Sequence, residues 1–524
     1  MKKILCLFFT FLACISQVHS ANLNWSQTPT VLSGASDNAS EPRLAMDPNG
    51  DVVAVWIENN VVVSSAKFFN SNWHTAVTVS GIGASSPRLV IDSNGNATAV
   101  WVQNAVITTS TKYYNNNWTT PIALSSSGAS NPTLCVDSAG DVIAAWLRNG
   151  NVESSSKLFG GAWQKNTAIK GTSATTLHIA IGGAGTGATA FLVWEGISNG
   201  TNVIYSSTKT ISGSWSSAQI ISETWHNAAQ PYTAVDANGN ALAIWYSYDN
   251  IGSNYTNVVV KSSAFSSTSG IWSQVTALSQ PGIRNPATLL ARVAYDSIGN
   301  GIALWNTSFD DETFNLESAV LPLYGNWSDP VDLVNSNLYA YSADLSATTF
   351  GDVLGLYMFY NGASLLIQSI ESDFNGFMNN FWSVPITISQ GTNNANPKIS
   401  ATLKNNKILA AAIWIQYNGT HNLIVASTGS KTLVLPPSHL KVIQSVTDFG
   451  VFEEYYNTLT WHASTDPQAA GYLIFRNGVF LEQVDASVLQ YIDYNRAVNE
   501  PTTYSVTTID SQQSQSQTIS VNFP

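Results

Sequence analysis

Short runs of apolar and β-branched residues recur along most of this chain, separated by polar or glycine-containing breaks. The segments 28–32, 42–46, 52–57 and 61–67 are four such runs in succession. Runs of this length bounded by turn residues are typical of β-strands, and no stretch keeps the 3.6-residue periodicity of a helix. The pattern therefore predicts an all-β fold.

A second, longer pattern groups these runs into units. Each unit begins with a tryptophan, continues through Pro-x-Leu, an Asp-x-Asn-Gly-like turn and Ala-Val-Trp, and ends in a Ser-Ser strand. The leading tryptophans recur at intervals of roughly 45 to 57 residues, close to the period of four-stranded blades. They are Trp25, Trp73, Trp118, Trp163, Trp215, Trp272, Trp327 and Trp382. The mid-unit series is Trp56, Trp101, Trp146, Trp194, Trp245, Trp305, Tyr357 and Trp414.

Each series has eight members, which predicts an eight-bladed β-propeller. One four-stranded sheet cannot bury both of its faces, whereas a closed ring of similar sheets buries them between neighbours. The tryptophans, each able to bury roughly 150 to 250 Å², are interpreted as packing residues between sheets. Seven blades is the alternative, because the fourth unit lacks the Pro and Asp signals and the seventh is degenerate.

The Asp-x-Asn-Gly-like turns admit two interpretations. As shortened calcium loops they would lack the bidentate Glu and the longer ligand series of an EF-hand. As hairpin turns they need only an Asp carboxylate that accepts backbone N–H groups and a Gly where φ is positive. We therefore predict structural turns and expect neither a bound metal nor another cofactor. The turn aspartates are Asp47, Asp92, Asp137, Asp236 and Asp296.

These repeats resemble the Asp-box and related Trp-containing repeats of bacterial propellers, including sialidase-like ones, over residues 25 to about 430. The turn here is followed six positions later by Trp, and the Ser-x-Asp-x-Gly-x-x-Trp of a proper Asp-box is absent. A sialidase-like enzyme would also need three converging arginines. Because Arg43 and Arg88 occupy the same repeat position, a structural role is predicted for both.

The remainder of the chain is similar to a fibronectin type III domain. Pro436 and Pro437 form a stiff joint, after which Trp461 is expected in the core and Tyr504 at the tyrosine corner. We therefore expect a signal peptide at 1–20, a propeller at 21–432, a linker at 433–437 and a fibronectin type III-like domain at 438–524.

The first residues have the order of a secretory signal. Lys2 and Lys3 precede an apolar run over 4–15, and cleavage is expected after Ser20. No later run of about 18 to 20 apolar residues could form a membrane-spanning helix, so a secreted, periplasmic or cell-surface protein is predicted. Cys135 is the one cysteine beyond the signal and is expected to be a buried hydrophobe.

The formal net charge of −12 opposes binding to nucleic acid or to anionic membranes. Because function tends to reside in variable loops on a rigid scaffold, the ligand site is predicted on the propeller rim formed by the loops after each mid-unit Trp. An aromatic and acidic patch is expected there, made of Trp225, His226, Tyr246, Tyr248, Asp249, Asp310, Asp311 and Glu312.

The sequence contains no motif of a known catalytic class, such as Gly-x-Ser-x-Gly or His-Glu-x-x-His. The expected function is therefore that of an exported, monomeric, non-catalytic binding or adhesion protein with a glycan or protein ligand. Two alternatives stay open: a sialidase-like glycoside hydrolase and a structural cell-surface component.

Overall fold

A computed structural model describes residues 23–169, 173–251, 254–283, 285–286, 289–296, 299–309, 314–323, 325–334, 339–348, 352–373, 382–451, 453–511 and 514–523. Strands and turns make up these segments. Helical structure among them is limited to a short 3₁₀ turn at Gly185–Gly187 and to residue 286. The prediction of an all-β fold is confirmed, whereas the expected signal at 1–20 lies outside the described residues.

From residue 39 to residue 432 the strands form successive antiparallel sheets, most of them four-stranded. The first strands of these sheets are β3 (Ala39–Met46), β7 (Ala84–Ile91), β11 (Ala129–Val136), β15 (Thr176–Gly182), β19 (Asn227–Val235), β24 (Ala291–Tyr295), β28 (Tyr339–Ala347) and β32 (Asn394–Lys404). The second strands are β4 (Val52–Glu58), β8 (Ala97–Gln103), β12 (Val142–Arg148), β16 (Thr189–Ser198), β20 (Ala241–Ile251), β25 (Gly301–Thr307), β29 (Asp352–Tyr360) and β33 (Lys407–Tyr417).

The third and fourth strands complete each sheet. The third strands are β5 (Val61–Lys67), β9 (Val106–Lys112), β13 (Asn151–Lys157), β17 (Thr201–Thr210), β21 (Asn254–Ser266), β26 (Asn315–Leu321), β30 (Leu365–Asp373) and β34 (Asn422–Thr432). The outer strands are β6 (Val77–Thr78), β10 (Ile122–Ala123), β14 (Thr167–Ile169), β18 (Gln219–Ile220), β22 (Ile271–Trp272) with β23 (Thr276–Ala277), β27 (Val331–Asp332) and β31 (Ile386–Thr387).

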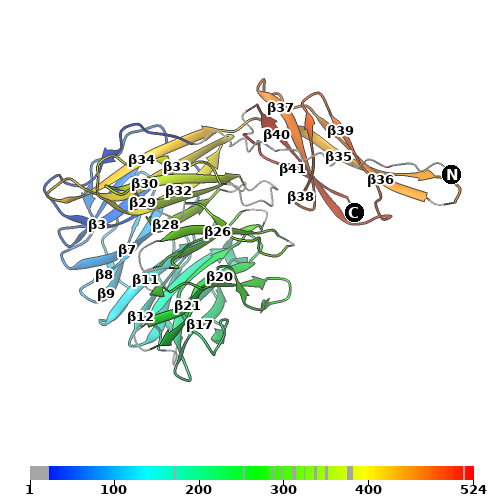
Figure 1. Cartoon of the computed structure of the whole chain (residues 1–524). Helices are drawn as coiled ribbons and strands as arrows, with labels where there is room; N and C mark the ends of the chain where they lie inside the picture. Colours follow the sequence, from blue (N-terminus) through cyan, green and yellow to red (C-terminus); the bar gives the residue numbers. More distant parts are fainter. Residues whose placement is uncertain are drawn as a thin grey trace.

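The sheets follow one another around a ring. The first strand of each sheet contacts the first strand of the next, from β3 through to β32, and β32 contacts β3 in turn. In Figure 1 the last sheet, coloured yellow, accordingly lies beside the blue strands of the first. A circle of this kind, with its first strands at the centre, is the arrangement of a β-propeller.

Chain segments about 400 residues apart close the ring. The sheet of β32, β33 and β34 takes its outer strands, β1 (Asn24–Trp25) and β2 (Thr30–Val31), from the start of the described chain. Trp25 lies directly over Gly429, where a Cβ atom would come within 2.8 Å of the indole. Only a glycine allows this approach, so the closing contact depends on Gly429.

The mid-unit aromatic residues pack between sheets. Trp101 shares a cluster with Val55, Ile57 and Val62 of the preceding sheet, and its side chain is fully buried. Its indole N–H is satisfied by Gln103 at 3.1 Å. Burial of an aromatic residue between two twisted sheets joins them without leaving a polar group unpaired. The other members of the series are equally buried: Trp56, Trp146, Trp194, Trp245, Trp305, Tyr357 and Trp414.

The region after residue 437 folds as two further sheets. One contains β35 (Ser438–Asp448), β36 (Glu453–His462) and β39 (Gln490–Asp493); the other contains β38 (Val479–Asp485), β37 (Ala469–Arg476), β40 (Thr502–Asp510) and β41 (Ile519–Phe523). Trp461 and Tyr504 are buried in one cluster built from both sheets. The Tyr504 hydroxyl bonds to Asp493 at 2.5 Å and to Asn457 at 3.0 Å.

Across the described segments, no helix has the length and apolar character needed to cross a membrane.

Candidate functional site

The Asp-containing turns lie at one end of the sheets and are stabilised by hydrogen bonds within each turn. In the second sheet, Oδ1 of Asp92 accepts the backbone N–H groups of Asn94 at 2.9 Å and Asn96 at 2.8 Å. The Asn96 amide carbonyl then accepts the N–H of Tyr114 in the next hairpin at 2.9 Å. The same pair of donors is present at Asp47, Asp137 and Asp236. At Asp296, Oδ1 accepts the backbone N–H groups of Gly299 and Asn300. These carboxylates are occupied by backbone donors, as expected of structural turns.

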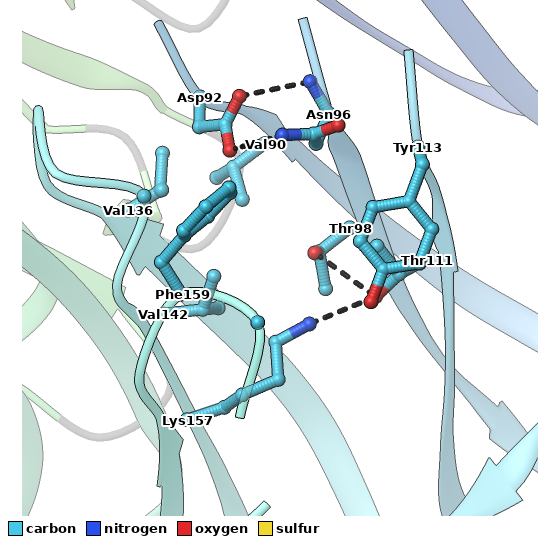
Figure 2. A pocket seen from close by; sticks show the side chains of 12 residues that line it. Val90, Asp92, Asn96, Thr98, Thr111, Tyr113, Val136, Val142, Lys157 and Phe159 are labelled. Carbon is cyan, nitrogen blue, oxygen red and sulfur yellow. Dashed lines mark hydrogen bonds between the residues drawn. The ribbon is translucent and has the colours of Figure 1, made fainter. Parts of the chain in front are cut away.

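A small pocket lies beside one of these turns, in the seam between two sheets (Figure 2). Lys157 reaches from β13 to donate to the Thr111 hydroxyl of β9 at 2.9 Å. Phe159 lies close to Gly140, where a Cβ atom would come within 2.8 Å of its ring. Because its polar groups are paired with one another, this pocket is a packing feature of the seam rather than a ligand site.

The opposite rim carries part of the predicted patch. His226, just before β19, lies 2.6 Å from Asp249 of β20, measured from Nδ1 to Oδ1. Asn257 of β21 donates to the other carboxylate oxygen at 2.8 Å. These hydrogen bonds, from Asn257 and then His226, lower the pKa of Asp249. The adjacent Trp225 is 72% exposed and is the one exposed tryptophan in the described chain.

The remaining predicted patch residues do not join this group on the surface. Tyr246 is fully buried, and its hydroxyl donates to the backbone carbonyls of residues 290 and 306. The prediction that Tyr246 contacts a ligand is therefore wrong. It follows Leu242 and Ile244 at every second position of β20, so it shares their buried face.

Tyr248 occupies the next position on that face. Its ring is largely buried, and its hydroxyl accepts a hydrogen bond from Asn202 at 3.2 Å. Asp310, Asp311 and Glu312, also predicted for the patch, lie outside the described residues.

The centre of the ring contains a set of residues that sequence reasoning missed. On each first strand, one residue pairs with the position directly before the buried mid-unit aromatic residue of the second strand. This register is the same in every sheet of the ring, so these residues form a single layer, called the central layer below. Its members are Arg43, Arg88, Thr133, His178, Tyr232, Arg292, Asp344 and Lys398.

Most of the first strands have a β-bulge immediately before the central layer. Register shifts occur between Ser40 and Arg43, between Ser85 and Arg88, and at the equivalent points of β11, β19, β28 and β32. A non-glycine residue with positive φ lies inside each bulge: Glu41, Ser86, Asn131, Gln230, Ser342 and Asn396. A bulge changes the direction of the side chains that follow it and often occurs beside functional sites.

Part of the central layer is a continuous set of contacts. The rings of His178 and Tyr232 stack at 3.7 Å, and the Arg292 guanidinium lies 4.7 Å from the centre of the Tyr232 ring. Arg292 is also 3.6 Å from Asp344, whose second oxygen accepts the N–H of Ile399 at 3.1 Å. Asp344 is therefore held by both neighbouring sheets.

The other cations of the layer have no such partner. Lys398, Arg43 and Arg88 lie on three successive first strands, β32, β3 and β7, and are called the cationic arc below. Each donates to the carbonyl of its own preceding proline, at 2.7, 2.7 and 3.0 Å respectively. Among the described residues none of the three forms an ion pair.

Burial and mutual repulsion alter the titration of these groups. Burial, together with repulsion from Arg43, Arg292 and Arg88, lowers the pKa of Lys398 to about 8, although Asp344 opposes this effect. Burial and the charges of Arg43 and Arg292 also lower the pKa of Arg88, although the carboxylate of Glu41 opposes this effect, as it does at Arg43. Arg292 thus acts electrostatically on Arg88 although β7 and β24 belong to sheets several places apart in the ring.

The sequence did contain a signal for the central layer. In five of the units the layer residue directly follows a proline, as in Pro42-Arg43 and Pro397-Lys398, and in three of them that proline begins Pro-x-Leu. The shared repeat position was interpreted as evidence of a structural role for Arg43 and Arg88. The structure places both, with Arg292, in the central layer.

Other candidate chemistry is limited in the described segments. No three His, Cys, Asp or Glu side chains there gather as the ligands of a metal ion would. Cys135 is buried in an apolar cluster with Ile143 and Ile179, and burial raises the pKa of its thiol.

Comparison with known proteins gives likenesses of structure only. No protein-family model matches the chain, and no curated protein matches it. A fucose-specific lectin from Aleuria aurantia is similar over 58% of this chain and 96% of its own, with 10% identity and a TM-score of 0.33. The polysaccharide lyase Uly1 is similar over 72% of this chain and 88% of its own, with 8% identity and a TM-score of 0.40.

An endo-arabinase from Bacteroides thetaiotaomicron matches 45% of this chain and 88% of its own, with 12% identity and a TM-score of 0.25. These scores are low, and neither a ligand nor a reaction is transferred from any of these proteins to this chain.

Proposed function

We propose that this chain is an exported, non-catalytic carbohydrate-binding protein. In this proposal the ring is an eight-bladed β-propeller, the two sheets after residue 437 are a fibronectin type III-like spacer or docking domain, and the glycan is bound at the rim that carries Trp225.

The observation that carries the proposal is the exposed indole of Trp225, which directly precedes His226, a member of a fixed polar group. The mid-unit Trp residues are buried between sheets and the leading ones are at least partly covered. Exposing one large aromatic surface to water has no packing benefit. Asp249 is held between His226 and Asn257, which orients its carboxylate and the Asn257 amide before any ligand arrives. An apolar ring face next to oriented acceptors and donors matches a sugar, which has an apolar C–H face and a rim of hydroxyls.

The location on the scaffold supports the same conclusion. β20 and β21 form a longer hairpin than β4 and β5 or β8 and β9, and its end lies beside His226. A long hairpin on a rigid ring can present a binding surface without disturbing the packing of the sheets.

The central layer bears on the sialidase-like alternative in two ways. It holds three arginines, Arg43, Arg88 and Arg292, as such an enzyme would need, but its tyrosine is unsuited to nucleophilic attack, which supports a non-catalytic role. Tyr232 is the one tyrosine in that layer, and burial raises the pKa of its hydroxyl. A hydroxyl that is harder to ionise is a poor nucleophile.

Glycan-array binding of the full chain, with a fluorogenic glycoside panel assayed in parallel, tests the proposal. Trp225→Ala is expected to reduce retention at least tenfold, because the stacking surface is removed. Tyr114→Ala is the matched control, since Tyr114 is an exposed aromatic residue beside the Asp-turn rim. Turnover of any glycoside, or retention unaffected by Trp225→Ala, would contradict the proposal.

A further inference from the structure

The central layer differs from every other repeat position of the ring. The mid-unit position is Trp in each sheet but one, and the turn aspartates of five sheets all accept backbone N–H groups, because each position has one structural task. The central-layer position carries Arg in three sheets and Thr, His, Tyr, Asp or Lys in the others. Repetition therefore does not account for the layer, although its backbone register is uniform.

The layer also concentrates positive charge in an acidic protein. Four cations and one carboxylate occupy it, while the whole chain has a formal net charge of −12. Like charges brought together away from bulk water destabilise the folded chain unless an opposite charge is supplied. Asp344 is already engaged by Arg292 and by the backbone of β32.

The cationic arc retains hydrogen-bond donors for a ligand. Each arginine of the arc uses one N–H on the carbonyl of its own strand, out of the five that a guanidinium carries. The side chains of Arg43, Arg88 and Lys398 are partly exposed, so solvent reaches them. Planar guanidinium groups bind oxyanions bidentately, and a lysine adds a mobile point charge.

We propose that the cationic arc binds an oxyanion of the ligand, a carboxylate or a sulfate ester, at the centre of the ring. This inference rests on the proposed function only in taking a sugar to be the carrier of the oxyanion. The stacked pair of His178 and Tyr232 forms the side of the central layer opposite the arc and contributes an aromatic face to the same ligand.

Titration calorimetry of the full chain tests the arc with three matched probes: methyl glucuronide, glucose 6-sulfate and methyl glucoside. The anionic probes are expected to bind at least tenfold more tightly than the glucoside. Arg88→Gln and Lys398→Met should each weaken the anionic probes by about 10- to 100-fold. Lys165→Gln, which removes an exposed cation elsewhere on the ring, should leave binding unchanged. Preference for the carboxylate or for the sulfate identifies which oxyanion the arc accepts.

Proton uptake gives a second readout. A bound anion favours the charged form of Lys398, which Asp344 also favours and which Arg43, Arg88 and Arg292 disfavour. Binding near pH 8 is therefore expected to take up protons, measured by titration in buffers of different ionisation enthalpy. Lys398→Met should abolish this uptake in addition to weakening the binding of the anionic probes.

The outcomes separate this inference from the proposed function. The proposal that the cationic arc binds an oxyanion is refuted by either of two results. One is that the anionic probes bind no better than methyl glucoside; the other is that they bind the arc variants as tightly as the natural chain. If a glycan still binds through Trp225 in that case, the proposed function stands alone. If inorganic sulfate binds through the arc while no sugar does, the arc stands and the carbohydrate function fails.

Discussion

Lys398→Met is expected to stabilise the folded protein at neutral pH. Burial and three neighbouring arginines lower the pKa of Lys398 from 10.5 to about 8. Since a tenfold change in a protonation equilibrium corresponds to about 1.4 kcal/mol, the charged form is disfavoured in the fold by up to about 3 kcal/mol. Methionine keeps the aliphatic stem but loses the hydrogen bond to the Pro397 carbonyl, worth about 1 kcal/mol.

The net gain is therefore about 2 kcal/mol, and its pH dependence follows from the same values. Below pH 8 Lys398 is protonated in both the folded and the unfolded chain, so the full penalty applies. Between pH 8 and 10.5 the unfolded chain holds the proton while the folded chain releases it, so the natural protein gains stability as pH rises. Above pH 10.5 both forms are neutral, and the advantage of the variant disappears.

Thermal unfolding across this pH range is the assay. A ring of roughly 400 residues unfolds with an entropy near 0.8 kcal/mol/K, so about 2 kcal/mol raises Tm by about 2 °C at pH 7. Lys165→Met, at an exposed position, should change Tm little at any pH. If Lys398→Met instead lowers Tm at pH 7, with no recovery toward pH 10, the ammonium group is stabilised within the fold and the argument for an unmet charge fails.

Four further outcomes are expected. Trp101→Ala should lower the free energy of unfolding by about 3 to 5 kcal/mol, measured by denaturant titration, because a fully buried indole joins two sheets. Asp92→Ala should cost about 1 to 3 kcal/mol in the same assay, since the backbone N–H groups of Asn94 and Asn96 lose their acceptor. Cys135 should stay unreactive toward Ellman's reagent at pH 8 until urea unfolds the chain, since burial raises its pKa. The folded pKa of Asp249 is lowered, so the charged carboxylate contributes to the fixed polar group above the ordinary carboxyl range and is lost as pH falls through its folded pKa. Glycan binding should decline at that acid pH, and Asp249→Asn should not show the decline.

Sequence reasoning performed best where a feature depends on neighbours along the chain. Alternating apolar runs and the Asp-x-Asn-Gly-like turns predicted strands and hairpins, and the structure places hydrogen-bonded turns at Asp47, Asp92 and Asp137. It failed at Tyr246, which was assigned to a surface patch because it follows Trp245 in a loop-proximal run. Strand alternation already places Tyr246 on the face of Ile244, so the burial of that face decided its role.

The amino-acid sequence by itself determined the all-β class, the repeat and the turn chemistry, because strand periodicity and turn propensity act over a few residues. The central layer was decided only by the tertiary structure. Its register depends on bulges that shift one strand against the next, and its members come together only when β1 and β2 pair with a strand some 400 residues away. Arg43 and Lys398 lie on neighbouring strands, β3 and β32, because the ring closes. No pattern of nearby residues in the sequence predicts that closure.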